Sequence, residues 1–202
     1  MVKEMPTARA SHVKGTGLHA LFDWYTRGHG QPQLLRFVAE LPPDVQSRFD
    51  TRDERLGVLA SEWYPAPLVH DLLDRLTAGL SDEQRAAAAW DMGQIAAEAA
   101  LTGLYRLLFQ AMMSPERYAR HVQKMFSRYF DDGLIVKTPR GPRRHHTSIH
   151  DWGGHHPLLC SLCVSSSVYV YTALGCRDVT SRRLSCVTEG ADHCAYDITW
   201  TG

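Results

Sequence analysis

Five cysteines lie in the last quarter of the chain, and four of them have spacings that suit a metal site. Cys186 and Cys194 flank a turn at Glu189–Gly190, so a hairpin across this turn would bring their thiols together. Cys160 and Cys163 are three residues apart in a segment of helical character and therefore share a face. Two thiolates from a helix and two from a hairpin are suitable donors for a tetrahedral zinc ion. We therefore expect structural zinc bound by Cys160, Cys163, Cys186 and Cys194.

The alternative is a set of free thiols, because cysteine in a reducing compartment packs as a small hydrophobic residue. An odd number of cysteines confined to one region favours reduced thiols or metal over a disulfide framework. His155, His156 and His193 are further candidate ligands.

A second group of residues predicts an apolar seam between the two longest helices. One interpretation is an ordinary filled core, and the other is a pocket for a hydrophobic or aromatic ligand. The pattern does not decide between them. The predicted ligand-binding residues are Tyr105, Phe109, Met112, Phe126, Tyr129 and Trp152. Trp152 ends a predicted strand that also carries His146, Ser148 and His150 on the same face.

Helical periodicity dominates the first two thirds of the chain, and strands appear only in the last third. Ser81 and Gln84 form a capping box that opens the longest predicted helix, which extends to about Met113. Ser114-Pro115-Glu116 starts the next helix. Strands are predicted at 134–138, 143–152, 178–187 and 193–200, with a helix at 155–175 between the second and third. The fold class is thus α+β, with an N-terminal helical bundle packed on a four-stranded antiparallel sheet of ββαββ order.

The expected organisation is a disordered leader at 1–13 followed by a single domain at 14–202, helical over 14–132 and ββαββ over 133–200. Lys and Arg balance Asp and Glu at 22 each, which gives no general attraction to nucleic acid. No stretch reaches the roughly 20 apolar residues of a membrane span, and we expect a cytoplasmic protein. The chain carries none of the common hydrolase, phosphate-loop or metalloprotease motifs, so we expect no enzymatic activity.

Both ends of the chain resemble a known superfamily. Its branches are vinyl-reductase-like domains, heme-NO-binding domains and transport-particle (TRAPP) subunits. The segment Val13–Gly30, the Cys186–Tyr196 tail and Trp200 are similar to an uncharacterised bacterial paralogous family, a domain of unknown function within it. In related vinyl-reductase-like sensor domains three Cys and one Glu bind zinc. Arg183 stands at that Glu position and cannot ligate zinc, so the resemblance implies Cys163, Cys176 or a His as the fourth ligand.

The resemblance implies a non-enzymatic sensing domain that binds a small hydrophobic ligand and holds a structural zinc ion. The alternative is a dimeric scaffold or protein-interaction module of TRAPP-like fold that takes no ligand. A homodimer is expected in either case. Heme is not expected, because His121 is flanked by Arg120 and Lys124 as on a solvated face. The Tyr-x-Ser-x-Arg signature of the heme-NO-binding branch is also absent.

Overall fold

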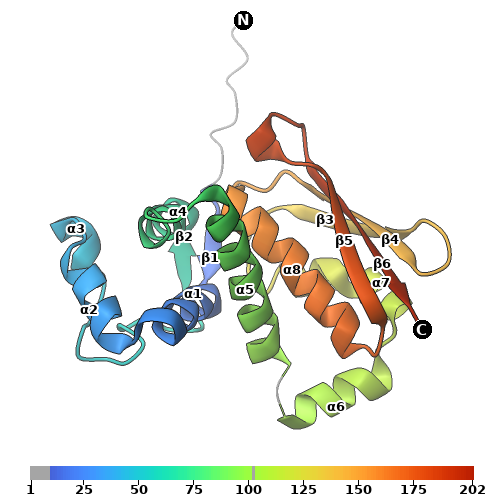
Figure 1. Ribbon diagram of the computed structural model, residues 1–202, viewed down its shortest axis with the longest axis horizontal. Helices are drawn as coiled ribbons and strands as arrows, with labels where there is room; N and C mark the ends of the chain where they lie inside the picture. The colour runs from blue at the N-terminus through green and yellow to red at the C-terminus, as the bar shows by residue number, and fades with distance from the viewer. Residues whose placement is uncertain (1–9, 102) are drawn as a thin grey trace, which may run out of the picture.

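The computed structural model describes residues 10–101 and 103–202, without the side chains of 103–106 and 108. Figure 1 shows a helical part beside a twisted sheet, with one helix, α8, lying between them. The helices are α1 (Gly15–His29), α2 (Gln31–Ala39), α3 (Pro43–Gln46), α4 (Ala66–Leu76), α5 (Asp82–Ala100), α6 (Gly103–Met112), α7 (Pro115–Phe126) and α8 (Pro157–Ala173). The strands are β1 (His12–Lys14), β2 (Trp63–Pro65), β3 (Leu134–Pro139), β4 (Arg144–His150), β5 (Arg177–Ser185) and β6 (Cys194–Thr201). The predicted α+β class is confirmed.

The four-stranded sheet has the order β3-β4-β6-β5, and every pair is antiparallel. Its register places Ile149 of β4 opposite Cys194 of β6, and Thr147 opposite Tyr196. Alternation turns Ile135 and Lys137 of β3 towards the helices, while Leu134 and Val136 are exposed. The predicted order of two strands, a helix and two strands is therefore confirmed.

Two predicted boundaries were wrong. The long helix predicted to reach about Met113 is divided into α5 and α6, and Leu101, which follows α5, has a non-helical backbone with φ −122° and ψ 59°. The next residues in sequence, Thr102 and Gly103, have low helix propensity, which favours a break here. His12 and Val13, assigned to a disordered leader, form β1, which pairs with β2; residues 1–9 of that leader lie outside the described part.

Both predicted helix starts are confirmed. The Ser81 hydroxyl accepts the backbone N–H of Gln84, and the Gln84 side chain accepts the backbone N–H of Ser81. Ser114 caps α7 in the same way, accepting from the N–H of Arg117, with Pro115 at the first helical position. These caps supply partners for N–H groups that the first turn of a helix cannot satisfy.

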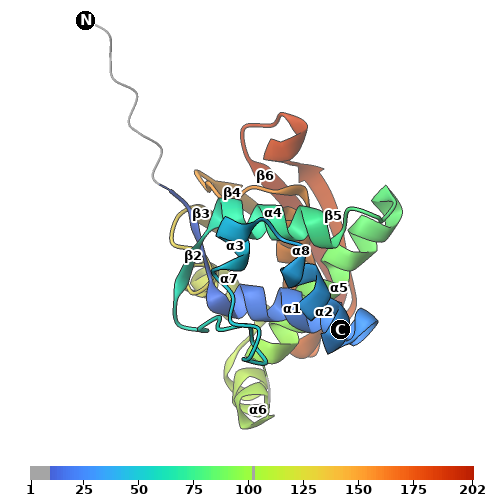
Figure 2. The same cartoon turned by 90° about the vertical axis from the view of Figure 1, so that its left-hand side faces the viewer.

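Helices α5 and α8 pack against each other more closely than ordinary side chains allow. At Gly93 of α5, an added Cβ would lie 2.5 Å from the carbonyl oxygen of Leu162 and 2.8 Å from Cβ of Ser165. Ser165 and Ser166 of α8 donate hydrogen bonds back to the carbonyls of Trp90 and Gly93. Helix α8 is thereby attached to α5 on one side while it also contacts β5 and β6 of the sheet (Figure 1). In Figure 2 the helical part with α1, α2 and α4 faces the viewer and the sheet lies behind it.

None of the described helices combines the length and the hydropathy needed to cross a lipid bilayer.

Gly93→Ala should lower the free energy of unfolding by about 1–3 kcal/mol, because the methyl group would overpack the α5–α8 contact. The matched control is Gly28→Ala in α1, where an added Cβ meets nothing within 4 Å. That variant should gain about 0.5–1 kcal/mol from helix propensity. Urea unfolding of both variants measures the difference, and equal effects at the two positions would contradict the packing interpretation.

Candidate functional site

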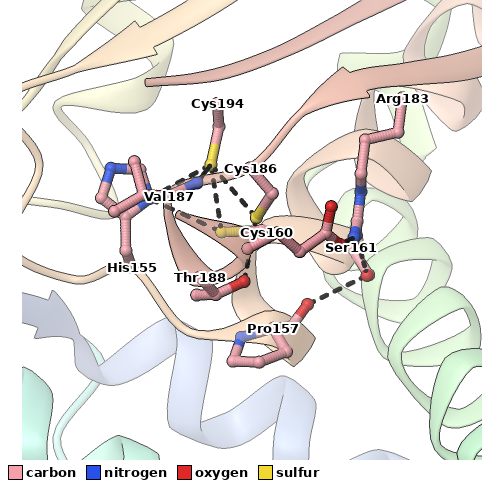
Figure 3. A network of polar contacts seen from close by, with 10 residues as sticks. His155, Pro157, Cys160, Ser161, Arg183, Cys186, Val187, Thr188 and Cys194 are labelled. Carbon is pink, nitrogen blue, oxygen red and sulfur yellow. Dashed lines mark hydrogen bonds and ion pairs between the residues drawn. The ribbon is translucent and has the colours of Figure 1, made fainter. Parts of the chain in front are cut away.

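A cluster of three thiols and one imidazole joins the start of α8 to the β5–β6 hairpin (Figure 3). Its centre is Cys194 Sγ, which lies 3.6 Å from Cys160 Sγ, 3.4 Å from Cys186 Sγ and 3.4 Å from His155 Nδ1. The backbone N–H of Val187 also donates to Cys194, at 3.3 Å. All three cysteines are at least 95% buried, so the cluster is shielded from solvent.

Hydrogen bonding lowers the pKa of Cys194, chiefly because the Cys160 thiol donates to it and secondarily through His155, Val187 and Cys186. Giving up that proton is correspondingly harder for Cys160, whose pKa is raised. The ligand atoms of His155, Cys160 and Cys194 all lie within 4.8 Å of one another. Sulfur and imidazole nitrogen at such distances could hold a metal ion.

The predicted four-thiol site is therefore only partly assembled. Cys160, Cys186 and Cys194 come together, but Cys163 does not join them and lines a neighbouring cavity instead. His155, one of the alternatives considered from the sequence, lies in the cluster instead. Arg183 stays outside, where it donates to Ser161 at 2.6 Å and to Glu189 at 3.0 Å.

A cavity of about 450 Å³ lies beside α8 and is lined by residues other than those of the thiol cluster. Its walls come from β1, α1, α4, α5, α6, α7, α8, β3 and β6, and most of its lining is apolar. Small residues on α5, such as Ala96, Ala97 and Ala100, leave room where larger side chains would fill it. The open-pocket interpretation of the apolar seam, rather than a filled core, agrees with this volume.

Three of the six predicted ligand-binding residues line the cavity: Phe109, Phe126 and Tyr129. Met112 does not, because it points outward with 64% of its surface exposed. Trp152 packs instead against Phe126, Phe130 and His155, outside the cavity. The side chain of Tyr105 lies outside the described part of the chain.

The cavity has two polar regions that the sequence did not indicate. At its inner wall the Ser167 and Tyr196 hydroxyls lie 2.8 Å apart, with Cys163 and Tyr118 also in the lining. Burial raises the pKa of Cys163 to about 12, so its thiol stays protonated at neutral pH. At the other region His121, Lys124 and Arg128 are exposed residues that also line the cavity, and we call these three residues the mouth.

Lys137 lies behind the inner wall and is 94% buried. Its Nζ has no hydrogen-bond partner among the described residues. It lies 5.3, 5.1 and 5.4 Å from the ring centroids of Tyr118, Tyr171 and Tyr196. Burial lowers the pKa of Lys137 to about 7, because an ammonium deprived of water has no carboxylate here to replace it. Three ring faces offset this by only about 0.5–2 kcal/mol.

No protein-family model and no curated protein matches the chain, but its fold is found among solved structures. An H-NOX (heme nitric oxide/oxygen binding) protein from S. oneidensis in the Fe(II)NO state has a TM-score of 0.68 at 11% identity, covering 94% of this chain and 99% of that one. The unliganded Fe(II) H-NOX protein from K. algicida has a TM-score of 0.60 at 11% identity, covering 94% and 97%. At these identities the likeness establishes the fold and nothing further.

A third similar structure, "Modulating Heme Redox Potential Through Protein-Induced Porphyrin Distortion", has a TM-score of 0.60 at 7% identity, covering 92% of this chain and 96% of that one. These matches overturn several expectations. The assignment to the vinyl-reductase-like and TRAPP-like group was wrong, as were the ligand sensor with a zinc site and the TRAPP-like scaffold offered in its place. The prediction of zinc as the cofactor was also wrong, and so was the prediction that heme is not to be expected. The physical reason for the last error is local: His121 is solvated, as predicted, yet it also lines a cavity that the sequence pattern cannot show.

Replacing Cys194 by Ala should lower the free energy of unfolding by about 1–3 kcal/mol, because it removes a buried acceptor and leaves its donors unpaired. Cys176→Ala is the matched control, since Cys176 is half-buried and outside the cluster. Its expected effect is about half as large or less. Denaturant unfolding under reducing conditions measures both. Equal losses would show that the cluster adds nothing beyond the burial of one thiol.

Lys137→Met should raise the free energy of unfolding, and the gain should depend on pH. The pKa of Lys137 falls from 10.5 in the unfolded chain to about 7 in the fold, so its penalty is complete below pH 7 and disappears above about pH 10.5. At 1.36 kcal/mol per pKa unit the upper limit is about 5 kcal/mol at pH 6, and less than half of that at pH 9.

Urea unfolding at these two pH values provides the test, with Lys124→Met as the control for loss of an exposed positive charge. A gain for Lys137→Met that is the same at pH 6 and pH 9 would contradict the lowered pKa.

Proposed function

We propose that this protein binds heme in the cavity beside α8 and senses a small gaseous ligand, rather than acting as an enzyme. The observation that carries the proposal is an apolar cavity of about 450 Å³ in a chain that has the H-NOX fold. This volume is within the range of about 300–1,000 Å³ typical of small-molecule and cofactor sites. The similar structures include H-NOX proteins in their Fe(II), Fe(II)CO and Fe(II)NO states.

The donor set of the cavity suits a porphyrin. Heme iron in proteins is held by imidazole, thiolate, thioether or phenolate groups. Among the described residues that line the cavity His121 is the only histidine, and we assign it as the residue that would bind the heme iron. Cys163 is a poorer candidate, because its raised pKa keeps it a thiol. The mostly apolar walls match the macrocycle, which has little hydrogen-bonding capacity of its own.

The remaining residues of the mouth suit the two carboxylates of a heme. Lys124 lies one helical turn after His121 on α7, and Arg128 follows the end of that helix. Both line the cavity while reaching solvent, where cations can pair with carboxylates at little desolvation cost. Buried Tyr118, Val122 and Phe126 anchor the inner side of α7 and so fix the direction of the mouth.

Each group of residues then has a distinct part. Bound heme iron supplies a coordination position that a diatomic gas can take. His121 would hold the group, Lys124 and Arg128 would orient its carboxylates, and the apolar walls would exclude water. Gas binding would be read out through α7 and α8, because both helices line the cavity and α8 also contacts the sheet.

Titration of the purified protein with hemin, followed by absorption spectroscopy, tests the proposal. We expect a shifted Soret band that saturates at one equivalent. His121→Ala should alter the spectrum and raise the dissociation constant at least tenfold, which corresponds to about 1.4 kcal/mol. Metal-free protoporphyrin should still bind this variant, because the cavity remains while only the iron ligand is lost.

His29→Ala is the matched control, since His29 is also an exposed helical histidine but does not line the cavity. It should bind hemin like the unaltered protein. The double variant Lys124→Ala/Arg128→Ala should weaken hemin and protoporphyrin alike, by about fivefold. Absence of a shifted Soret band from folded protein would refute the proposal, and an unchanged His121→Ala spectrum would refute the ligand assignment.

A further inference from the structure

Lys137 is a buried basic group next to the cavity that the proposed function does not use. A lysine amine so deeply buried normally has a carboxylate or several hydrogen bonds, yet Nζ has no partner among the described residues. Two of the three rings around it, Tyr118 and Tyr196, also line the cavity. A single layer of side chains therefore separates the amine from the space where a ligand would lie.

We propose that Lys137 is an imine-forming site for an aldehyde or ketone carried on an apolar group that enters the cavity. The proposal stands apart from heme binding, since it needs the cavity and the amine but no metal or porphyrin. The apolar walls select a carbonyl compound with a hydrophobic body. To reach Nζ, the carbonyl group must displace the ring of Tyr118 or Tyr196.

A carbonyl compound fits this site better than an anion. An anion would require the ammonium form, which burial disfavours. The aromatic faces around Nζ carry partial negative charge and would repel a carboxylate. A neutral amine has a free lone pair, which is the nucleophile that attacks a carbonyl carbon.

The reaction balances without an oxidant or reductant. The Nζ lone pair adds to the carbonyl carbon and gives a carbinolamine. The proton lost from nitrogen then passes to the departing hydroxyl group, so one water leaves and a C=N bond remains. Hydrolysis reverses these steps.

The titratable groups near Nζ of Lys137 provide no negative charge that would hold the amine in its protonated form. Tyr118 and Tyr196 have pKa values raised by burial, so both are neutral phenols at pH 7. Tyr171 is raised in the same way, and His145 of β4 has a lowered pKa because it is also buried. Glu116 acts on His145 and Tyr171 and forms no ion pair with Lys137 among the described contacts.

Reductive trapping tests the site. The full chain, free of porphyrin, is incubated at pH 7 with benzaldehyde and sodium cyanoborohydride, with Nα-acetyl-lysine in the same solution as an internal standard. Asp-N digestion releases the peptide 132–150, in which Lys137 is the only lysine. We expect benzylation of this peptide at least ten times faster than of the standard. No label on the peptide while the standard is labelled would overturn the proposal.

Two variants test which amine is labelled and whether the aldehyde reaches it through the cavity. Lys137→Met should remove the label from peptide 132–150 while the protein keeps its circular dichroism spectrum. Ala96→Phe, which narrows the cavity from α5 and leaves the amine in place, should slow the labelling at least fivefold. An unchanged rate in folded Ala96→Phe protein would show that the aldehyde does not arrive through the cavity, and would overturn that part of the proposal. Neither result depends on whether hemin binds.

Discussion

The close packing of α8 between α5 and the four-stranded sheet decides where every candidate functional group lies. Gly93 allows the two helices to approach to a distance that a single methyl group would prevent. Because α8 is fixed on both sides, its two faces have separate environments. Cys160 faces the β5–β6 hairpin, and Cys163 and Ser167 face the cavity. The same helix thus positions a thiol cluster and one wall of a ligand site.

The two regions differ in chemistry because they differ in what surrounds them. At the thiol cluster the Cys160 thiol of α8 donates a hydrogen bond to Cys194, and this lowers the pKa of Cys194. Cys163, only three residues from Cys160, lies among apolar groups, and its pKa rises to about 12. Burial likewise disfavours the charged form of Lys137, but because that form is the protonated one, the pKa of Lys137 is lowered. Environment rather than residue type decides which of these groups is reactive.

The fold is shared with H-NOX structures at identities near 11%, so few individual residues carry the likeness. What the chains share is the arrangement of helices and strands. The cysteine pattern at the end of the chain led instead to a different branch, because it describes a local hairpin. A local pattern carries no information on the volume left between nine separate elements.

The sequence by itself determined the helix caps, the ββαββ pattern and the hairpin that carries Cys186 and Cys194, because these follow from spacing and periodicity, which are local properties. It did not separate Cys163 from the thiol cluster, reveal the cavity or place an unpartnered amine behind it. Those features depend on contacts between segments distant in sequence, such as Lys137 on β3, Tyr171 on α8 and Tyr196 on β6. Only the tertiary structure decided them, because enclosed volume and loss of hydration are properties of the packed chain.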